Sequence, residues 1–388
     1  MKSKVLAIFK YHRAWNIDII NRFSNFYATE HIYISDYSNK NFSDIIKNIN
    51  EIISSKNIDI VIFDVDYFRF INFFFIEKII CKKKILVTGD DFELHEMHAI
   101  TASACDVVLS HCPFSVLKFK EKGFEAYPIS FEISNLNNDK EEKRDIDVLF
   151  FGNITSDRKE ILDYISNQGI SLKNVSHSKH ELGLQKEDLL KLISKSKIVL
   201  NLSKSKTTSV QNYAGKKIYP YYYQFKGRVI LAGLKGAACV SEYSPGQELI
   251  FDEVEVPTFY TKEECVEILK KLLKDKILLE ECTKRFVSKT NKLWDDKKNF
   301  EPIYKAIEKA ENRKVTLNGF PYWYLRIVAK QIMLRNLKLS TIFKALAQFD
   351  LIFLLLKKAN FLSKPAIFIE TIINTFWYAF IFTFRSKK

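Results

Sequence analysis

Glycine is scarce in this chain of 388 residues, which contains only 11 of them. Such a low count argues against an all-β protein, because that class needs many tight turns. The six cysteines form no Cys-x-x-Cys pair, and several lie in apolar runs such as Ala237–Val240. We interpret them as small core side chains in a reducing compartment, and we expect neither disulfides nor a zinc site.

The N-terminus also lacks a long apolar run. Val5–Phe9 is followed directly by Lys10, so the run is too short for a signal peptide and predicts a first β-strand. With 47% hydrophobic residues the chain can pack a core, but its length exceeds one ordinary core. We therefore expect two domains and an additional segment.

Positive charge is concentrated at one end of the chain. The formal net charge is +14, yet Arg313–Lys388 alone holds thirteen Lys or Arg against two acids, Asp350 and Glu370. The preceding residues are therefore close to neutral. The basicity indicates a partner of the C-terminal segment and says little about an active site elsewhere.

Apolar strands alternate with helical segments over the N-terminal part, which is typical of a parallel sheet covered on both faces. The predicted strands are Val5–Phe9, Ile32–Ile34, Ile58–Asp64, Lys84–Thr88 and Asp106–Ser110, and the predicted helices are Ile17–Phe26, Phe42–Ser54 and Pro113–Gly123.

A polar stretch, Asn135–Arg144, interrupts this pattern and predicts an interdomain linker. A second alternating unit follows, with strands at Asp147–Phe151, Leu172–Val175, Ile198–Leu202 and Ala237–Val240, a strand or helix at Gly227–Leu231, and helices at Glu263–Leu273 and Lys276–Ser288. The expected organisation is an N-terminal Rossmann-like domain (1–134), a linker (135–145), a C-terminal Rossmann-like domain (146–294), a crossover helix (295–318) and a basic aromatic helical segment (319–388).

The second unit carries the features of a phosphate site. The strand Asp147–Phe151 ends in Gly152-Asn153, a helix opens near Asp157, and a basic segment begins at Gly227. This arrangement suits a nucleotide diphosphate that lies across the strand ends of an open α/β sheet. The cationic candidates are Arg158, Lys159 and Arg228, with Lys206 on the loop after Ile198–Leu202 as a further one, and arginine is favoured for bidentate contact with phosphate.

The same residues resemble the GT-B glycosyltransferases, and specifically the spore-maturation-protein-like branch of the "glycosyl transferases group 1" family. The resemblance covers about residues 145–290 in detail and only the architecture of 1–130. The matching residues are Phe150, Gly152, Arg158, Arg228, Gly233 or Gly236, Ser241, Glu242 and Glu248. It implies a GT-B α/β fold of two facing Rossmann-like domains, and a donor site that includes Gly152, Asn153, Arg158, Lys206, Arg228, Ser241, Glu242 and Glu248.

One position departs from the family pattern. The family places a ribose-binding Glu three residues after the Arg that matches Arg228, whereas this chain has Leu231. The resemblance implies a hexosyltransferase that retains the anomeric configuration, and the missing Glu leaves the retaining mechanism open.

The N-terminal domain is expected to hold the acceptor and any catalytic group. Asp90, Asp91 and His95 follow the strand that ends at Thr88, and carboxyl ends of parallel strands line such clefts. The alternative is ordinary turn chemistry, in which an Asp caps the next helix. His12 and Arg13, on the loop after the first strand, are candidates for acceptor binding.

No cofactor or metal is expected beyond the nucleotide-sugar co-substrate. Asp64-Val65-Asp66 spells an Asp-x-Asp motif, but the trio is common by chance and the chain predicts two sheets. His95-Glu96-Met97-His98 lacks the two histidines four residues apart that a zinc-protease helix carries.

Beyond Gly319, aromatic and aliphatic residues are interleaved with Lys and Arg, as in helices that lie in an anionic membrane interface. The run Pro365–Phe384 is long enough to span a bilayer, but Glu370 within it favours in-plane binding. Packing of this segment onto the protein body or onto a partner is the remaining alternative.

The leading hypothesis is a metal-independent glycosyltransferase. It would be peripheral on the inner face of a bacterial plasma membrane and transfer sugar to a glycan or lipid-linked acceptor of surface polysaccharide or glycolipid synthesis. The alternatives are a nucleotide-sugar epimerase and an inactive scaffold of the same fold. A nucleic-acid-binding protein is disfavoured, because the basic residues are embedded in apolar faces instead of a polar stripe.

Overall fold

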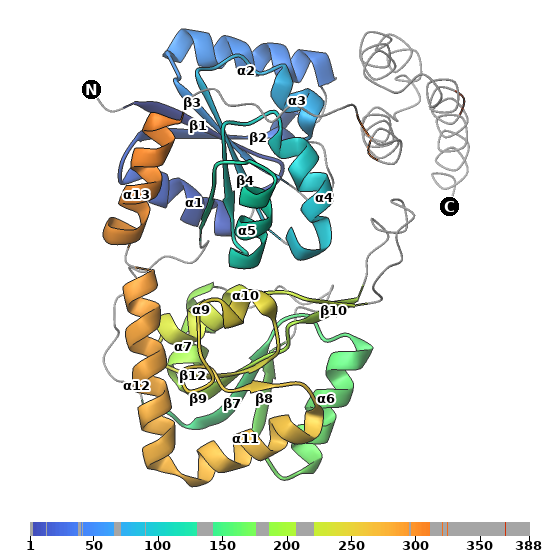
Figure 1. Ribbon diagram of the computed structural model, residues 1–388, viewed down its shortest axis with the longest axis vertical. Helices are drawn as coiled ribbons and strands as arrows, with labels where there is room; N and C mark the ends of the chain where they lie inside the picture. Colours follow the sequence, from blue (N-terminus) through green and yellow to red (C-terminus); the bar gives the residue numbers. More distant parts are fainter. Residues whose placement is uncertain are drawn as a thin grey trace.

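Two parallel β-sheets, each covered by helices, are stacked one above the other in the computed structural model (Figure 1). The structure describes residues 3–12, 14–37, 40, 42–65, 71–89, 91–129, 143–175, 186–206, 221–294, 296–310, 320, 324 and 369. The predicted strands of both units are found within one to a few residues of their expected positions.

The N-terminal domain contains a sheet of six parallel strands in the order β2-β1-β3-β4-β5-β6. The strands are β1 (Lys4–Phe9), β2 (Ala28–Tyr33), β3 (Ile60–Asp64), β4 (Lys83–Thr88), β5 (Val107–Ser110) and β6 (Ala126–Pro128). Because successive side chains of a strand point to opposite faces, β1 places Leu6 and Ile8 in one core cluster and Val5, Ala7 and Phe9 in the other.

Helices cover both faces of this sheet. They are α1 (Ala14–Ser24), α2 (Phe42–Lys56), α3 (Phe73–Glu77), α4 (Asp91–Ala102) and α5 (Pro113–Glu121), with a 3₁₀ turn η1 (Ile34–Tyr37). Side chains of α2, α3, α4 and α5 fill one core cluster, whereas α1 fills the other. Asn72 caps α3 by accepting hydrogen bonds from the backbone N–H groups of Phe74 (3.0 Å) and Phe75 (3.2 Å).

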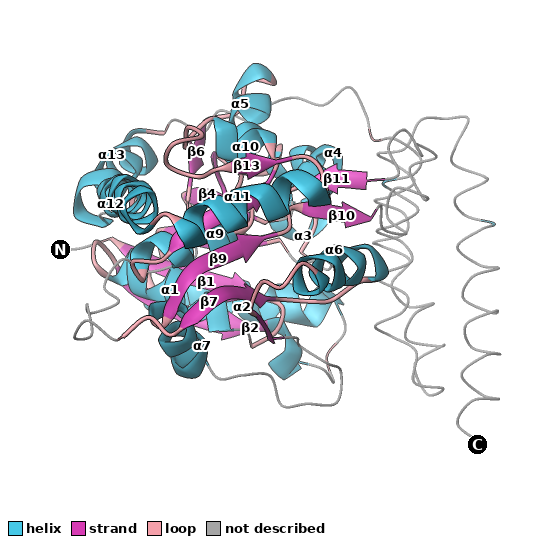
Figure 2. Ribbon diagram, turned by 90° about the horizontal axis from the view of Figure 1, so that it is seen from below, coloured by secondary structure: helices cyan, strands magenta, loops and turns pink. Residues whose placement is uncertain are grey.

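The C-terminal domain contains a sheet of five parallel strands in the order β13-β12-β9-β7-β8. The strands are β7 (Ile146–Phe151), β8 (Leu172–Val175), β9 (Ser196–Asn201), β12 (Ala238–Glu242) and β13 (Thr258–Phe259). A separate antiparallel pair, β10 (Lys204–Lys206) and β11 (Tyr221–Tyr223), projects beyond the edge of this sheet (Figure 2).

The helices of the C-terminal domain are α6 (Ser156–Asn167), α7 (Lys186–Ser194), α9 (Gly227–Leu234), α10 (Pro245–Glu248), α11 (Lys262–Lys274) and α12 (Lys276–Leu293). The segment Gly227–Leu231, for which strand and helix were both open, is helical. Its short apolar run does not distinguish the two states, and tertiary packing decides between them. Here β9 pairs directly with β12, so α9 lies on the face of the sheet.

The chain then returns to the N-terminal domain (Figure 1). Helix α13 (Asp296–Lys309) packs beside α1, where the ring centroid of Phe300 lies 5.2 Å from that of Phe23 at an interplanar angle of 82°. The ring centroid of Tyr304 lies 5.1 Å from that of Tyr27. The second face of the N-terminal sheet is therefore closed by a helix that follows the C-terminal domain in sequence.

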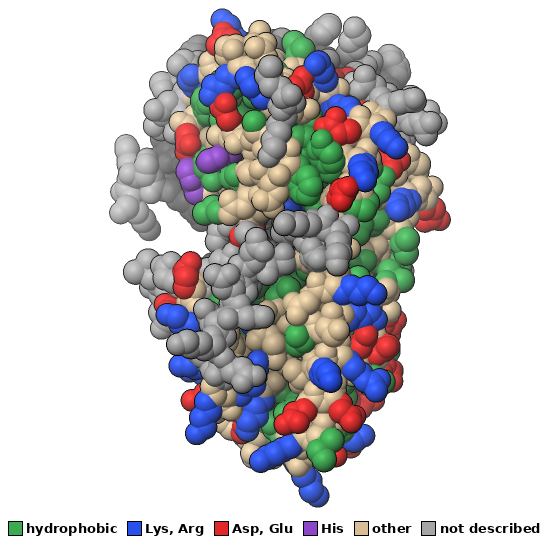
Figure 3. Space-filling view, turned by 90° about the vertical axis from the view of Figure 1, so that its left-hand side faces the viewer, with side chains coloured by type: hydrophobic (Ala, Val, Ile, Leu, Met, Phe, Trp, Pro, Cys, Tyr) green, Lys and Arg blue, Asp and Glu red, His purple; other side chains and the backbone are tan. Residues whose placement is uncertain are grey.

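Acidic and basic side chains are interspersed over the lower, C-terminal domain on the side seen in Figure 3. This mixture agrees with the near-neutral charge of the chain before its basic end. Among the described residues, no helix is long and apolar enough to cross a membrane. Apart from Phe320, Tyr324 and Ile369, the segment 319–388 lies outside the described residues.

The close packing of α9 against α12 yields a stability prediction. A Cβ atom at Gly233 would lie 2.7 Å from Cβ of Thr290. Gly233→Ala should therefore destabilise the protein by about 1–2 kcal/mol in urea unfolding, because overpacking outweighs the gain in helix propensity. In a Thr290→Gly background the same change should be neutral or stabilising. Equal destabilisation in both backgrounds would contradict this contact.

Candidate functional site at the strand ends

The carboxyl ends of β7, β9 and β12 form the centre of the candidate site. Gly152 follows β7 directly and has a φ of +133°, a backbone conformation that favours glycine. A Cβ atom there would lie 2.6 Å from Nη2 of Arg228. Gly152 thus allows a close approach, and the group that approaches in this structure is the guanidinium of Arg228.

Arg228 extends from the first turn of α9 toward these strand ends. Its guanidinium carbon lies 5.0 Å from the ring centroid of Phe150 and 5.7 Å from that of Phe151. Its Nη1 donates to Oδ1 of Asn201 (3.3 Å) and to the carbonyl of Leu202 (3.2 Å). All these partners are neutral, so they orient the cation without cancelling its charge.

Arg158 reaches the same point from the first turn of α6. Its Nη1 donates to the carbonyl of Asn153 at 2.8 Å, and its Nη2 donates to the carbonyls of Leu202 and Lys204, both at 3.3 Å. The carbonyl oxygen of Leu202 therefore accepts from both guanidinium groups. Arg158 and Arg228 are each only 9% exposed.

Glu242 is the last residue of β12, and its carboxylate acts electrostatically on both Arg158 and Arg228. It is 5% exposed, and its Oε2 accepts a hydrogen bond from the backbone N–H of Lys204 at 2.7 Å. Burial raises the pKa of Glu242, while the Lys204 amide and the charge of Arg158 oppose that rise. The backbone of Lys204 thus contacts both side chains, because its N–H donates to Glu242 and its carbonyl accepts from Arg158.

The charge of the cluster is unbalanced. Burial lowers the pKa of Arg228 to about 9, and repulsion from Arg158 adds to the effect, but both arginines stay cationic at neutral pH. Within the described part of the chain, neither forms an ion pair with a carboxylate. Two buried cations and one buried carboxylate leave an excess of one positive charge, which an anionic group would neutralise.

The other predicted donor residues lie around this cluster. Asn153 is exposed beside Gly152, and Ser241 is buried, where its Oγ accepts from Nδ2 of Asn201 at 2.8 Å. Glu248 is exposed at the end of α10. Lys206 ends β10, and its side chain lies outside the described residues. The structure therefore groups Gly152, Arg158, Arg228, Ser241 and Glu242, while Glu248 lies at the rim.

Leu231 packs against the apolar cluster beneath α9. The position at which the family resemblance places a ribose-binding Glu thus contributes to the core in this protein. The described carboxylate that acts on the Arg158–Arg228 pair comes from Glu242, eleven residues further along the chain.

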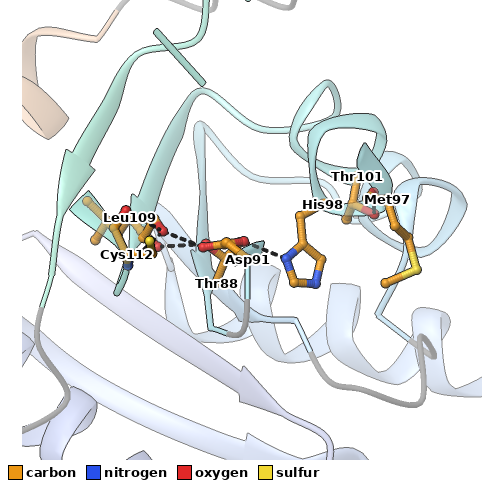
Figure 4. Close-up of polar contacts among 8 residues, drawn as sticks. Thr88, Asp91, Met97, His98, Thr101, Leu109 and Cys112 are labelled. Carbon is orange, nitrogen blue, oxygen red and sulfur yellow. Dashed lines mark hydrogen bonds and ion pairs between the residues drawn. The ribbon is translucent and has the colours of Figure 1, made fainter. Parts of the chain in front are cut away.

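Asp91 is fully buried at the first turn of α4, where it joins three elements of the N-terminal domain (Figure 4). Its Oδ1 lies 2.6 Å from Nδ1 of His98. Its Oδ2 accepts hydrogen bonds from the hydroxyl groups of Thr88, at the end of β4, and Ser110, at the end of β5. Asp91 therefore fixes the helix to two strand ends, and Asp90 lies outside the described residues.

His95 lies one turn further along α4, and it is 3% exposed. Its ring centroid is 4.4 Å from that of Phe119, and both ring nitrogens are buried without a hydrogen-bond partner among the described residues. Burial, and secondly the nearby charge of Lys118, lower the pKa of His95 to about 4. His95 is thus a neutral imidazole inside the domain in this structure, and its predicted catalytic role stays a prediction.

His12 follows β1 and is exposed. Its ring stacks on Tyr33 at a centroid distance of 3.6 Å, and its Nε2 lies 3.1 Å from Oδ1 of Asp36. Arg13 lies outside the described residues. Sequence reasoning missed Asn201, which bridges Arg228 and Ser241, and also His98. A signal was present for both, since Asn201 is the penultimate residue of a predicted strand and His98 is seven residues from Asp91 on one helix face.

The two domains meet beside this site. Cys112, at the start of α5, packs with residues of the C-terminal domain, and a Cβ atom at Gly246 of α10 would lie 3.3 Å from its sulfur. On the side of α12 and α13, a cavity of about 620 Å³ separates the domains, lined by Tyr127, Ile230, Leu249, Trp294 and Phe300 among others. Within the described residues, no group of three or more His, Cys, Asp or Glu is placed to hold a metal ion.

Residues 139–296 match a family model described as glycosyl transferase-like. This segment spans the C-terminal domain with its arginine cluster. No curated protein sequence matches the chain.

Solved structures match both domains together. Anabaena HepE in complex with UDP-glucose superposes with a TM-score of 0.56 at 11% identity, over 79% of this chain and 99% of HepE. Sucrose-phosphate synthase from Thermosynechococcus elongatus gives 0.54 at 8% identity, over 80% and 100%. A glycosyltransferase from Rickettsia africae gives 0.53 at 12% identity, over 80% and 100%. The chain has the GT-B fold.

The environment of His95 predicts a pH dependence of stability. Its pKa is about 4 in the folded state and about 6.5 when exposed, so the unfolded chain binds more protons between these values. The free energy of unfolding should therefore fall by about 2 kcal/mol through this group as the pH falls from 7 to 5.

Urea unfolding at pH 7 and pH 5 tests this expectation. His95→Phe should remove that part of the loss and leave stability at pH 7 equal or higher, because the phenyl ring has no nitrogens to satisfy. His31→Gln, at an exposed histidine of β2, is the matched control and should behave as wild type. An undiminished loss in His95→Phe would show that another group titrates.

Proposed function

We propose that this protein is a glycosyltransferase that transfers a sugar from a nucleotide-sugar donor to a glycan or a lipid-linked acceptor. The observation that carries the proposal is the buried, positively charged cluster of Arg158 and Arg228 at the carboxyl edge of the C-terminal sheet. In open α/β sheets ligands bind at this edge. The match of residues 139–296 to a glycosyl transferase-like family supports the same reading.

The cluster fits the chemistry of the leaving group. A nucleotide diphosphate carries negative charge that increases when the sugar departs, and fixed cations stabilise that charge without reorganisation. Arg228 is held by aromatic faces and neutral acceptors, so its charge remains available to a diphosphate placed beside Gly152. HepE was solved with UDP and glucose and with UDP-glucose, which places a uridine nucleotide first among the donors to be tested.

In this proposal the arginines take the place of a divalent metal in stabilising the diphosphate, and the reaction retains the anomeric configuration. The acceptor approaches from the N-terminal domain, where the first turn of α4 and the loop after β1 follow the carboxyl ends of β4 and β1. The acceptor belongs to bacterial surface polysaccharide or glycolipid synthesis.

The basic aromatic segment 319–388 supports a further part of the proposal. Thirteen Lys or Arg and two acids between Arg313 and Lys388 suit an anionic lipid surface. The enzyme would work as a peripheral protein on the inner face of the plasma membrane, where a lipid-linked acceptor is accessible.

A nucleotide-sugar epimerase of the same fold is the second candidate, and the replacement of the expected acid by Leu231 keeps an inactive scaffold as an alternative to both. The products separate the two candidates. A transferase releases the nucleoside diphosphate, whereas an epimerase returns a nucleotide sugar with altered stereochemistry. A scaffold would do neither.

Thermal melting with UDP, GDP, CDP, dTDP and ADP, each with and without EDTA, tests the donor site. A nucleotide at about 100 times its dissociation constant should stabilise the protein by about 2.7 kcal/mol and raise the melting temperature by at least about 2–4 °C. We expect one nucleotide, UDP first, to do so with no effect of EDTA. Arg228→Ala should abolish the shift, because it removes the cation at Gly152.

Arg285→Ala is the matched control, since Arg285 is exposed on α12 of the same domain and should leave the shift unchanged. The melting temperature of each variant without nucleotide shows whether it is folded. A full shift in folded Arg228→Ala, or no shift with any nucleotide in wild type, would contradict the donor-site assignment.

A further inference from the structure

Phe320 and Tyr324, near the start of the basic segment 319–388, are built into the core of the N-terminal domain. They are 6% and 1% exposed, and they belong to the same apolar cluster as α2, α3, α4 and α5. The ring centroid of Phe320 lies 4.7 Å from that of Phe73 and 5.2 Å from that of Phe74. We call Phe320 and Tyr324, with their partners on α3 and α4, the aromatic anchor.

The hydroxyl group of Tyr324 both accepts and donates a hydrogen bond within this anchor. Its oxygen accepts from the backbone N–H of Phe73, the first residue of α3, at 3.0 Å. Oγ1 of Thr101 lies 3.1 Å from the same oxygen, and Thr101 already donates its single hydroxyl proton to the carbonyl of Met97 at 3.1 Å. Tyr324 must therefore donate to Thr101.

The phenol stays protonated for this task, because burial raises the pKa of Tyr324 to about 12. The backbone N–H of the first residue of α3 and a hydroxyl near the end of α4 are thus both bonded by one side chain from a segment more than 220 residues later. Such a buried, fully paired phenol specifies one docking position for the start of the segment.

The segment follows the last helix of the two-domain fold, α13. The matched structures of HepE, sucrose-phosphate synthase and the Rickettsia africae glycosyltransferase are covered over 99% to 100% of their lengths, while 79% to 80% of this chain is covered. Residues beyond α13 make up one fifth of the chain, the same share that those structures leave unmatched. The aromatic anchor therefore attaches the start of this C-terminal segment to one of the two domains.

We propose that the N-terminal domain is the domain fixed to an anionic membrane, and that the aromatic anchor is the joint between this domain and the membrane-binding segment. The inference rests on the proposed membrane partner of residues 319–388, whose basic and aromatic composition fits an anionic lipid surface. The hydrogen bonds of Tyr324 to Phe73 and Thr101, and the ring contacts of Phe320 with α3, are all to the N-terminal domain.

The contact of the aromatic anchor with α4 relates it to the acceptor side of the N-terminal domain. Helix α4 carries Thr101 in its last turn and Asp91 in its first turn, where Asp91 binds the ends of β4 and β5. One helix thus connects the anchor to the end of the domain at which we place the acceptor. The C-terminal domain, with the donor cluster, is left free of the membrane and can exchange nucleotide with solvent.

Hydrogen exchange of the full chain, with and without vesicles of equal parts phosphatidylglycerol and phosphatidylcholine, tests this arrangement. Without vesicles, Tyr324→Ala should make the amides of α3 and of the last turn of α4 exchange at least about tenfold faster, since truncating a buried aromatic residue costs well over 1.4 kcal/mol. Tyr324→Phe keeps the ring and loses both hydrogen bonds, so it should give a smaller acceleration of the same amides. Tyr260→Ala, at an exposed tyrosine of the C-terminal domain, is the control and should leave them unchanged.

With vesicles, wild-type protein should bind and show slower exchange in peptides of α3 and α4, and not in those of α6 and α11. Tyr324→Ala should still bind vesicles through the rest of the segment, but its α3 and α4 peptides should lose the additional protection. Vesicle protection on α6 and α11, equal protection in Tyr324→Ala and wild type, or no vesicle binding by wild type would each overturn the proposal. Nucleotide melting shifts on the same samples report separately on the donor site.

Discussion

The guanidinium of Arg228 against the backbone of Gly152 is the contact on which the rest of the site depends. A buried cation at this point requires a glycine after β7, aromatic faces at Phe150 and Phe151, and neutral acceptors at the end of β9. The shared carbonyl of Leu202 brings in Arg158, and Glu242 offsets only part of the joint charge. The excess positive charge is what suits this strand edge to a diphosphate.

The two sheets position different residues in this arrangement. The C-terminal sheet directs three strand ends toward the arginine cluster, and the N-terminal sheet is held at its facing edge by Asp91, which ties α4 to β4 and β5. Helix α13 closes the N-terminal core from beyond the C-terminal domain, so neither part of the chain is complete without the other. The aromatic anchor adds the basic segment to the same domain.

Much of the fold was predictable because its strands are continuous apolar runs between helical segments. That Gly152, Arg158 and Glu242 lie together was predictable for a related reason, since they stand beside strand ends in the sequence. The helix α9 was ambiguous, because its apolar run fits a buried strand equally well. The pairing of β9 with β12, which excludes a strand between them, is set by the tertiary structure.

The N-terminal site was harder to predict. Asp91 and His95 follow the expected strand end, but they lie on α4, and whether a polar side chain of a helix faces the cleft or the core depends on the rotation of that helix, which a short motif does not encode. Phe320 and Tyr324 looked like part of a uniformly membrane-seeking segment, and only the contacts with Phe73 and Thr101 distinguish them as core residues.

A structure of the protein in complex with the stabilising nucleotide diphosphate tests the central claim most directly. The account predicts that the phosphates lie beside Gly152 and contact Arg228, between the ends of β7 and β9 and the first turn of α9. A diphosphate bound away from these strand ends, for example in the cavity beside α12 and α13, would contradict it.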